Sequence, residues 1–303
     1  MIEVRNLTKY YGSIRGVEDL SLKVPKGAVC GLIGPNGAGK TTTLKLLCCL
    51  LKPTSGEAWV AGVSIREELK VKKLIGYLPE SQILYGFLTV REHIELAGRL
   101  HKLPRAELKA KAKALMEELK LSQLEDRRCG ALSLGQRRRV GLALALIGDP
   151  EVLLLDEPTS GLDPAQRASL LKLIKAMAEE GRTVLLSSHV LHEVSEACST
   201  IAVLREGRLA YHGSLEEFRE RYCPIVEVEA PGVEKLESEV KGMWGAKSVK
   251  AERGKLTVEA SDLDAARVGL VKLLAAHSLP VRSLRSPGLE EAYLKLVGEE
   301  GAA

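Results

Sequence analysis

The sequence has few aromatic residues, little net charge and no long apolar run. Phe, Trp and Tyr make up 4% of its 303 residues, which disfavours a stacking surface for single-stranded nucleic acid. The net charge of +4, from 44 basic and 40 acidic residues, is too small to indicate a polyanionic partner. The longest uncharged apolar runs, such as residues 140–148, fall well short of the ~20 residues of a membrane-spanning helix. We therefore expect no nucleic-acid partner and no membrane span in this chain.

The six cysteines show neither a disulfide framework nor the spacing of a metal site. None belongs to a Cys-x-x-Cys pair, and most lie within apolar runs, where cysteine acts as a small hydrophobic residue. We also expect no signal peptide, because a strand pattern begins directly at Ile2. Both features favour the reducing cytoplasm.

One segment carries a strong chemical signature, Gly34-Pro35-Asn36-Gly37-Ala38-Gly39-Lys40-Thr41-Thr42. It follows an apolar run at 28–33 and precedes another at 44–51, which is the strand–loop–helix order of a phosphate-binding P-loop. The glycines let successive N–H groups turn toward an anion, and the following helix adds its positive end. Lys40 supplies a charge for the β- and γ-phosphates, and the Thr41 hydroxyl can bind Mg²⁺. The chain is predicted to bind a nucleoside triphosphate.

A second motif is the apolar run at 152–155 that ends in Asp156 and Glu157. Asp156 lies where a carboxylate can hold Mg²⁺, and Glu157 can orient and deprotonate a water that attacks the γ-phosphate. Many strands end in solvated carboxylates, so the motif alone is a weak signal. Together with the P-loop it favours a catalytic site.

The pattern of elements predicts an α/β protein. Buried strands expected at 28–33, 152–155 and 183–186 alternate with helices, which indicates a parallel sheet covered on both faces. Further short strands are expected at 2–4, 20–24 and 56–65. Helices are predicted after a capping box at Thr89 and after Asp163-Pro164.

The character of the sequence changes after residue 222. Short alternating strands are expected at 225–228, 256–258 and 281–284, with helices at 263–276 and 289–297. We predict a nucleotide-binding domain over 1–222, with a helical subdomain at about 86–135, and a small α+β accessory domain over 223–303.

With these motifs in place, the sequence resembles the nucleotide-binding subunit of an ATP-binding-cassette (ABC) transporter over residues 1 to about 220. Leu132-Ser133-Leu134-Gly135-Gln136 resembles the family's LSGGQ signature, and Ser160-Gly161-Leu162-Asp163 resembles its D-loop. His189 matches the switch histidine, and Tyr11 the aromatic that stacks on adenine, with Tyr10 as the alternative register. The resemblance implies a P-loop NTPase (RecA-like) core with an antiparallel β subdomain and a helical subdomain.

The resemblance also implies ATP and Mg²⁺ bound between two cassettes arranged head to tail. Lys40, Glu157 and His189 would be catalytic, and Thr41, Asp156 and Glu80 would bind the metal. The signature of the opposite subunit would complete each pocket. The nucleotide-contacting residues would be Tyr11, Gly34, Pro35, Asn36, Gly37, Ala38, Gly39, Lys40, Thr41, Thr42, Glu80, Ser133, Gly135, Gln136 and Asp163.

Two residues depart from the family pattern. Glu80 stands where the Q-loop usually has glutamine, and a carboxylate can bind Mg²⁺ but donates no hydrogen bond unless protonated. Leu134 replaces the first glycine of the signature, next to the γ-phosphate of the implied sandwich. Both changes bear on turnover more than on nucleotide binding.

The predicted function is an Mg-dependent ATPase subunit on the cytoplasmic side of the membrane that powers a separate transmembrane permease. The segment 287–294 resembles the tail of export ATPases, which favours an exporter. The alternatives are a soluble ABC-class ATPase that acts on ribosomes or DNA, and a regulatory module that binds ATP but hydrolyses it weakly. Most of the arginines in the run Arg137–Arg139 are expected to be solvated or paired locally.

Overall fold

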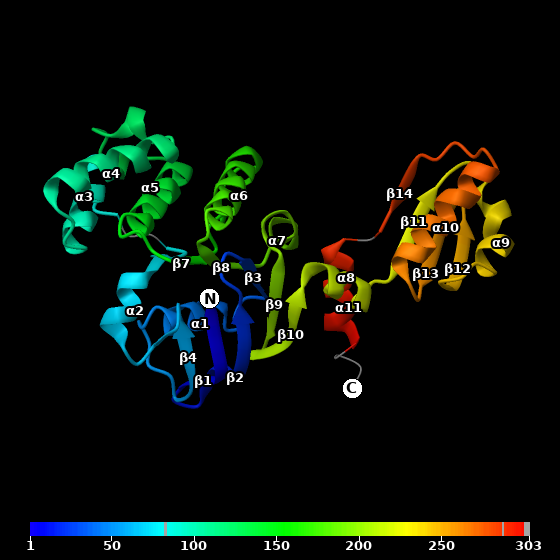
Figure 1. Ribbon diagram of the computed structural model, residues 1–303, viewed down its shortest axis with the longest axis horizontal. Helices are drawn as coiled ribbons and strands as arrows, with labels where there is room; N and C mark the ends of the chain where they lie inside the picture. The colour runs from blue at the N-terminus through cyan, green and yellow to red at the C-terminus, as the bar shows by residue number, and fades with distance from the viewer. Residues whose placement is uncertain (82–83, 287, 300–303) are drawn as a thin grey trace. The chain divides into compact units, whose positions relative to one another are not determined.

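The computed structural model describes residues 1–81, 84–286 and 288–299 (Figure 1). The chain divides into two compact units, Met1–Gly213 and Ser214–Ala303. This division falls before the predicted boundary at residue 222. Helix α8 (Leu215–Tyr222) packs against α11 (Leu289–Glu299), so α8 belongs to the second unit.

A six-stranded sheet in the order β10-β9-β3-β8-β7-β6 forms the centre of the first unit. Neighbouring strands from β9 through β3, β8 and β7 to β6 pair in parallel, and β3, β7 and β8 are buried along their whole length. Parallel strands place their carboxyl ends at one edge, where ligands bind in such sheets. The six strands are β3 (Val29–Ile33), β6 (Ile75–Leu78), β7 (Val152–Asp156), β8 (Thr183–Ser188), β9 (Thr200–Arg205) and β10 (Arg208–Ser214).

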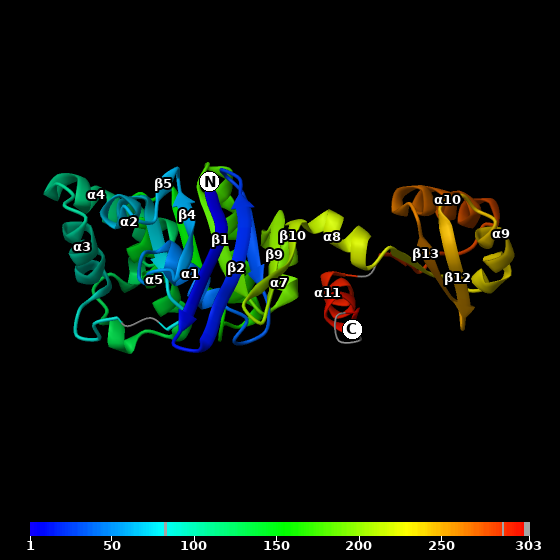
Figure 2. The same cartoon turned by 90° about the horizontal axis from the view of Figure 1, so that it is seen from below.

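A second sheet of the same unit has the order β2-β1-β4-β5 (Figure 2). Its strands are β1 (Ile2–Tyr11), β2 (Ile14–Val24), β4 (Ser55–Val60) and β5 (Val63–Ser64), and they pair antiparallel. Strands β1 and β2 run further than predicted, through register shifts beside the positive-φ residues Asn6 and Asp19. Helix α1 (Lys40–Leu47) lies between the sheets, and its Leu44 and Leu47 share one apolar core with residues of both.

The remaining helices of the first unit are α2 to α7, and α3, α4 and α5 gather at one end of it (Figure 1). Helix α3 begins at the predicted capping box, in which Thr89 and Glu92 exchange hydrogen bonds. Helix α6 begins at Asp163 with Pro164 in its first turn, as predicted. The helices are α2 (Glu68–Leu74), α3 (Val90–Leu100), α4 (Arg105–Glu118), α5 (Leu134–Leu146), α6 (Pro164–Glu179) and α7 (Leu191–Ala197), with 3₁₀ turns at Ser122–Leu124 and Cys129–Ala131.

The second unit contains an antiparallel sheet in the order β12-β13-β11-β14. Its core is apolar and joins sheet residues such as Val226 and Val258 to Leu270 of α10. The bounds are β11 (Ile225–Glu229), a 3₁₀ turn (Val233–Leu236), α9 (Glu237–Lys241), β12 (Ala246–Glu252), β13 (Lys255–Ala260), α10 (Leu263–Ala276) and β14 (Ser283–Arg285). Over the described residues of the whole chain, no helix has the length and apolarity needed to cross a membrane.

Candidate functional site

A cavity of about 540 Å³ lies beside the P-loop of the first unit. This volume is in the range of small-molecule sites. Eleven of the predicted site residues line it: Tyr11, Asn36, Gly37, Ala38, Gly39, Lys40, Thr41, Thr42, Glu80, Glu157 and His189. Three further lining residues, Ile14, Arg15 and Gly16, were not predicted, and they begin the strand that follows the Tyr11 turn.

The P-loop has the backbone geometry that its glycines suggested. Gly39 caps helix α1 with φ 100°, and a Cβ there would lie 2.6 Å from the carbonyl oxygen of Gly16, so only glycine fits. Lys40 is 6% exposed, and its Nζ donates to the carbonyl oxygens of Gly34 at 2.7 Å and Pro35 at 3.2 Å. Gly34 and Pro35 therefore position the Lys40 side chain through their carbonyl groups, and they do not line the cavity.

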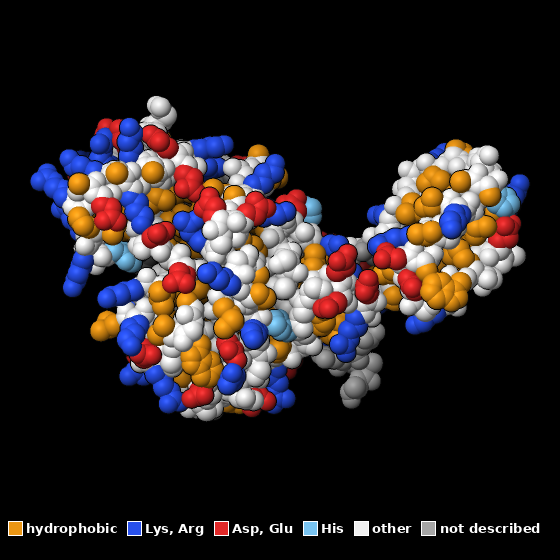
Figure 3. Space-filling model, viewed as in Figure 1, with side chains coloured by type: hydrophobic (Ala, Val, Ile, Leu, Met, Phe, Trp, Pro, Cys, Tyr) orange, Lys and Arg blue, Asp and Glu red, His pale blue; other side chains and the backbone are white. Residues whose placement is uncertain are grey.

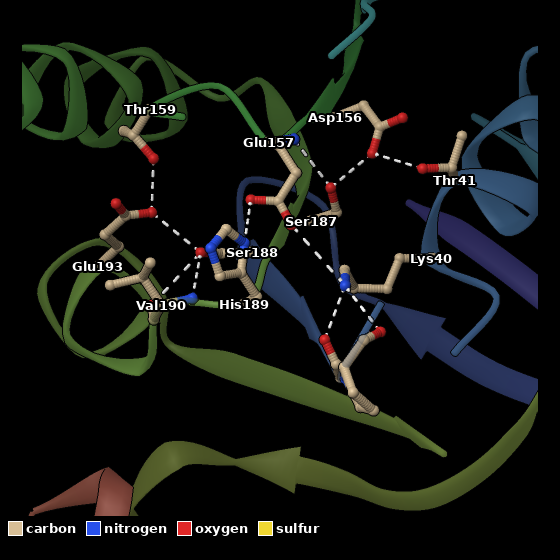
Figure 4. Close-up of polar contacts among 12 residues, drawn as sticks. Lys40, Thr41, Asp156, Glu157, Thr159, Ser187, Ser188, His189, Val190 and Glu193 are labelled. Carbon is tan, nitrogen blue, oxygen red and sulfur yellow. Dashed lines mark hydrogen bonds and ion pairs between the residues drawn. The ribbon is translucent and has the colours of Figure 1, made fainter. Parts of the chain in front are cut away.

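Glu157 connects Lys40 to His189 (Figure 4). Its Oε1 lies 3.7 Å from Lys40 Nζ, and its Oε2 lies 2.9 Å from His189 Nδ1. The carboxylate is buried at the end of β7, whereas the His189 side chain is 53% exposed. Glu157 has φ 46°, a left-handed conformation that is strained for a residue with a side chain. A carboxylate placed between a cation and an imidazole, facing a cavity, has the position of a general base.

Asp156 does not line the cavity, but it is hydrogen-bonded to Thr41, which does. The Thr41 hydroxyl donates to Asp156 Oδ1 at 3.1 Å, and the Ser187 hydroxyl donates to the same oxygen at 2.7 Å. Ser187 Oγ also accepts from the Glu157 backbone N–H at 2.9 Å. Ser187 was not predicted, although its place opposite Asp156 follows once β7 and β8 are paired.

The donor atoms near the P-loop suit Mg²⁺ shared with phosphate oxygens. Thr41 and Asp156 offer oxygen ligands, and Glu80 lines the same cavity. In the described part of the chain, no three His, Cys, Asp or Glu side chains are grouped so that they could hold a metal by themselves. Mg²⁺ usually binds one or two carboxylates together with substrate phosphates and waters, so this partial set fits it.

Of the two neighbouring tyrosines, Tyr11 faces the cavity. It is 44% exposed, and a Cβ on Gly16 would lie 2.8 Å from its Cε2, so the ring lies against that glycine. Tyr10 instead donates its hydroxyl to Glu18 at 2.8 Å. Hydrogen bonds from Arg15, Tyr10 and Arg208 lower the pKa of Glu18 to about 2.

The predicted signature and D-loop residues lie at the N-termini of α5 and α6 and do not line the cavity. Ser133 and Gln136 form a capping box, with hydrogen bonds of 3.3 and 3.0 Å between them. Asp163 caps α6 by accepting from Gln166 N at 2.9 Å. Leu134 reaches toward the D-loop, because its Cδ2 lies 2.6 Å from where a Cβ of Gly161 would be. Ser133, Gly135, Gln136 and Asp163 therefore form a second cluster, separate from the P-loop cavity.

The three consecutive arginines are all bound to backbone carbonyl groups. Arg137 donates to Leu132 O and Arg139 to Leu119 O, at 3.1 Å each. Arg138 is 5% exposed and donates to Pro79 O at 3.0 Å. Burial lowers the pKa of Arg138, against the opposing effect of Glu80 and the other nearby carboxylates. Arg138 is therefore an exception among arginines of which most were expected to be solvated or locally paired, and it links α5 to the segment that carries Glu80.

Comparison with known proteins matches this chain to one family by a family model and by individual relatives. Residues 17–160 match the family model described as ABC transporter. The chain is 34% identical over 305 residues to the Nod factor export ATP-binding protein I of Ralstonia nicotianae, covering 99% of this chain and 94% of that protein. It is also 34% identical over 311 residues to the daunorubicin resistance ATP-binding protein DrrA3 of Streptomyces coeruleorubidus, covering 99% and 96%.

Other relatives are much longer than this chain. The solved structures cover 73% and 71% of it. The human phospholipid-transporting ATPase ABCA7 is 40% identical over 226 residues, which are 74% of this chain but 10% of that protein. An ATP binding subunit of an ABC transporter has a TM-score of 0.67 at 30% identity, covering 73% of this chain and 93% of its own. A dimeric ATP-binding cassette bound to ADP and Pi has a TM-score of 0.65 at 27% identity, covering 71% and 99%. The chain belongs to the ATP-binding proteins of the ABC transporter family.

Proposed function

We propose that this chain is a Mg²⁺-dependent ATPase subunit that drives export through a separate transmembrane partner, at the cytoplasmic side of the membrane. The observation that carries the proposal is the placement of Glu157 between Lys40 and His189 at the edge of the P-loop cavity. Two relatives that align over almost the whole chain are named for export and for drug resistance, which supports an exporter.

The residues around the cavity divide the work of phosphoryl transfer. Lys40 and the P-loop N–H groups offset phosphate charge, and the Tyr11 ring offers a face for the adenine. Glu157 accepts a proton from the attacking water, and the His189 imidazole hydrogen-bonds the γ-phosphate. Thr41 and Asp156, with Glu80 nearby, would hold Mg²⁺, which when bound offsets the charge of the phosphate oxygens. Catalysis then rests on positioning and electrostatics.

The second cluster supports a head-to-tail pair of cassettes. Ser133, Gly135, Gln136 and Asp163 lie away from the cavity of their own chain, at helix N-termini that favour an anion. In the pair, each cluster would face the nucleotide bound by the other chain. The dimeric cassette structures among the matches support this arrangement.

Steady-state ATP turnover of the purified chain with Mg²⁺ tests the catalytic assignment. Glu157→Gln should lower kcat about a thousandfold, since general bases contribute 10²–10⁴-fold, while nucleotide still binds. Glu180→Gln is the matched control, because Glu180 is exposed and forms an ion pair with nearby Arg182. Equal turnover in the wild type and Glu157→Gln would defeat the assignment. Failure to recover any integral membrane protein with the tagged chain would count against the transmembrane partner.

A regulatory module that binds ATP but hydrolyses it weakly is the second candidate. Glu80 and Leu134 are the observations behind it, because both depart from the family pattern. Glu80 lines the P-loop cavity, and Leu134 lies beside Gly161 of the D-loop. If they suppress hydrolysis, the double change Glu80→Gln with Leu134→Gly should raise kcat about tenfold or more. Unchanged turnover in that variant favours the transport ATPase.

A further inference from the structure

Glu193 is a buried carboxylate of α7 that the proposed mechanism does not use. Its residue is 2% exposed, and it does not line the P-loop cavity. Its Oε2 accepts hydrogen bonds from Thr159 Oγ1 at 2.5 Å and from Ser188 Oγ at 2.9 Å (Figure 4). Its Oε1 forms an ion pair with Arg167 Nε at 3.0 Å. One carboxylate of α7 thus joins groups from α6, from the end of β8 and from the loop that carries Thr159.

The two hydroxyl partners flank the proposed catalytic residues. Thr159 is 1% exposed and lies between Glu157 and the D-loop that ends at Asp163. Ser188 directly precedes His189, and its Oγ also accepts from Val190 N at 2.9 Å. Ser188 therefore ties the backbone on both sides of the histidine to Glu193.

Packing alone does not explain a charged group at this place. Removing a carboxylate from water costs several kcal/mol, and well-packed apolar residues often replace buried ion pairs with no loss of stability. Here the carboxylate is retained, and each of its oxygens has a polar partner. When one oxygen accepts hydrogen bonds from two hydroxyl groups, a displacement of one hydroxyl moves the oxygen and thereby changes the hydrogen bond of the other hydroxyl.

We propose that Glu193 is a positioning residue that couples the D-loop to the loop carrying His189. A displacement of Thr159 moves the carboxylate, the carboxylate moves Ser188, and Ser188 shifts the imidazole relative to Glu157. The proposal rests on the proposed function, because it assigns the coupling to ATP hydrolysis. Its consequence is that engagement of the D-loop by a second cassette adjusts the catalytic pair.

Glu193→Gln separates positioning from nucleotide binding. The amide keeps the shape of the side chain but loses its charge, so we expect kcat to fall roughly ten- to hundredfold, as for a small misplacement of reacting groups. The dissociation constant for ATP should stay within about threefold of the wild type. The matched control is Glu196→Gln on the same helix, where Glu196 is exposed and pairs with His192, and its kcat should be unchanged. Wild-type kcat in Glu193→Gln would overturn the proposal.

A double-mutant cycle with Thr159→Val tests the route of the coupling. If Glu193 acts through the Thr159 hydroxyl, Glu193→Gln should lower kcat by a smaller factor in the Thr159→Val background than in the wild type. If Glu193→Gln lowers kcat by the same factor in both backgrounds, the proposed route through Thr159 is contradicted. Because Thr159→Val removes only one hydroxyl, it also provides a test if Glu193→Gln fails to fold.

Histidine NMR gives a readout that does not depend on turnover. Thr159→Val should shift the ring resonances of His189, although the Thr159 hydroxyl bonds to Glu193 and the imidazole to Glu157. Unmoved His189 resonances would contradict the coupling. An inactive wild type with shifted resonances would instead refute only the proposed ATPase function.

Discussion

The first unit buries charged side chains beside its cavity, whereas the second unit buries an apolar core. Wherever the structure describes burial, every buried polar or charged residue lies in the first unit, including Lys40, Asp156, Glu157 and Glu193. The pair Lys255–Glu227 of the second unit lies nearer the surface, and charges of both signs cover the visible face of the molecule (Figure 3). Buried ions are costly and are retained where chemistry needs them. We therefore expect changes in the first unit to alter activity, and changes in the second to alter stability.

The core of the second unit offers the largest stability effect. Leu270→Ala removes a fully buried side chain of α10 and should cost about 2–5 kcal/mol in the free energy of unfolding of that unit. Val271→Ala, one residue on and 54% exposed, should cost no more than about 0.5 kcal/mol. Hydrogen exchange followed by mass spectrometry would locate the loss. If ATP turnover falls in proportion to the unfolding, the functional separation of the units is disproved.

Lys40→Met tests the opposite side of the comparison. It removes the buried charge next to Glu157 and the proposed phosphate contact, so nucleotide affinity should fall about a hundredfold. Lys255→Met removes a lysine paired with Glu227 in the second unit and should leave nucleotide affinity within about twofold. Titration with a fluorescent nucleotide measures both. Similar losses in the two variants would show that the contrast between the units is not functional.

Capping serines provide a matched pair of smaller changes. Ser133 of α5 and Ser214 of α8 form the same type of capping box, with Gln136 and Glu217 respectively. Ser133→Ala and Ser214→Ala should each cost about 1 kcal/mol in the free energy of unfolding. Only Ser133→Ala should also lower kcat, by roughly tenfold, if it binds the nucleotide of a second cassette. Equal kcat in both variants would leave Ser133 with a capping role alone.

The smallest expected effect is a pH dependence in the helical region. Burial lowers the pKa of His93 below its ordinary 6.5, so the unfolded state binds more protons than the folded state as the pH falls. Its contribution to stability is fully present above about pH 6.5 and is lost toward the lower folded-state pKa. Urea unfolding at about pH 7.5 and about pH 5.5 should show a smaller loss in His93→Gln than in the wild type. An equal loss would exclude His93 as a source, leaving groups such as His212, whose pKa burial also lowers.

Signals confined to a few consecutive residues were predicted well from the sequence. The strand–loop–helix order located the P-loop, and short capping patterns placed the starts of α3 and α6. The periodicity of residues 263–276 gave the bounds of α10. In each case the interactions that stabilise the element join near neighbours in the chain.

Features that depend on distant contacts were missed. Ser187 and Glu193 gain their partners only when β7, β8 and α7 come together, and Arg138 spans from α5 to Pro79. Strand β12 was overlooked because its side chains are mostly exposed, with Val249 as its buried apolar residue. The division between the compact units falls before the predicted boundary because the contact between α8 and α11 joins segments far apart in the sequence.

The left-handed backbone of Glu157 lowers the stability of the fold at the residue that we propose as the general base. A side chain in this conformation costs about 1–2 kcal/mol. Glycine avoids this cost, and asparagine adopts the conformation more easily than glutamate does. Replacing Glu157 by asparagine should therefore abolish turnover without lowering the melting temperature. Thermostabilising selection on this protein, if turnover is not monitored, would favour inactive variants at this position.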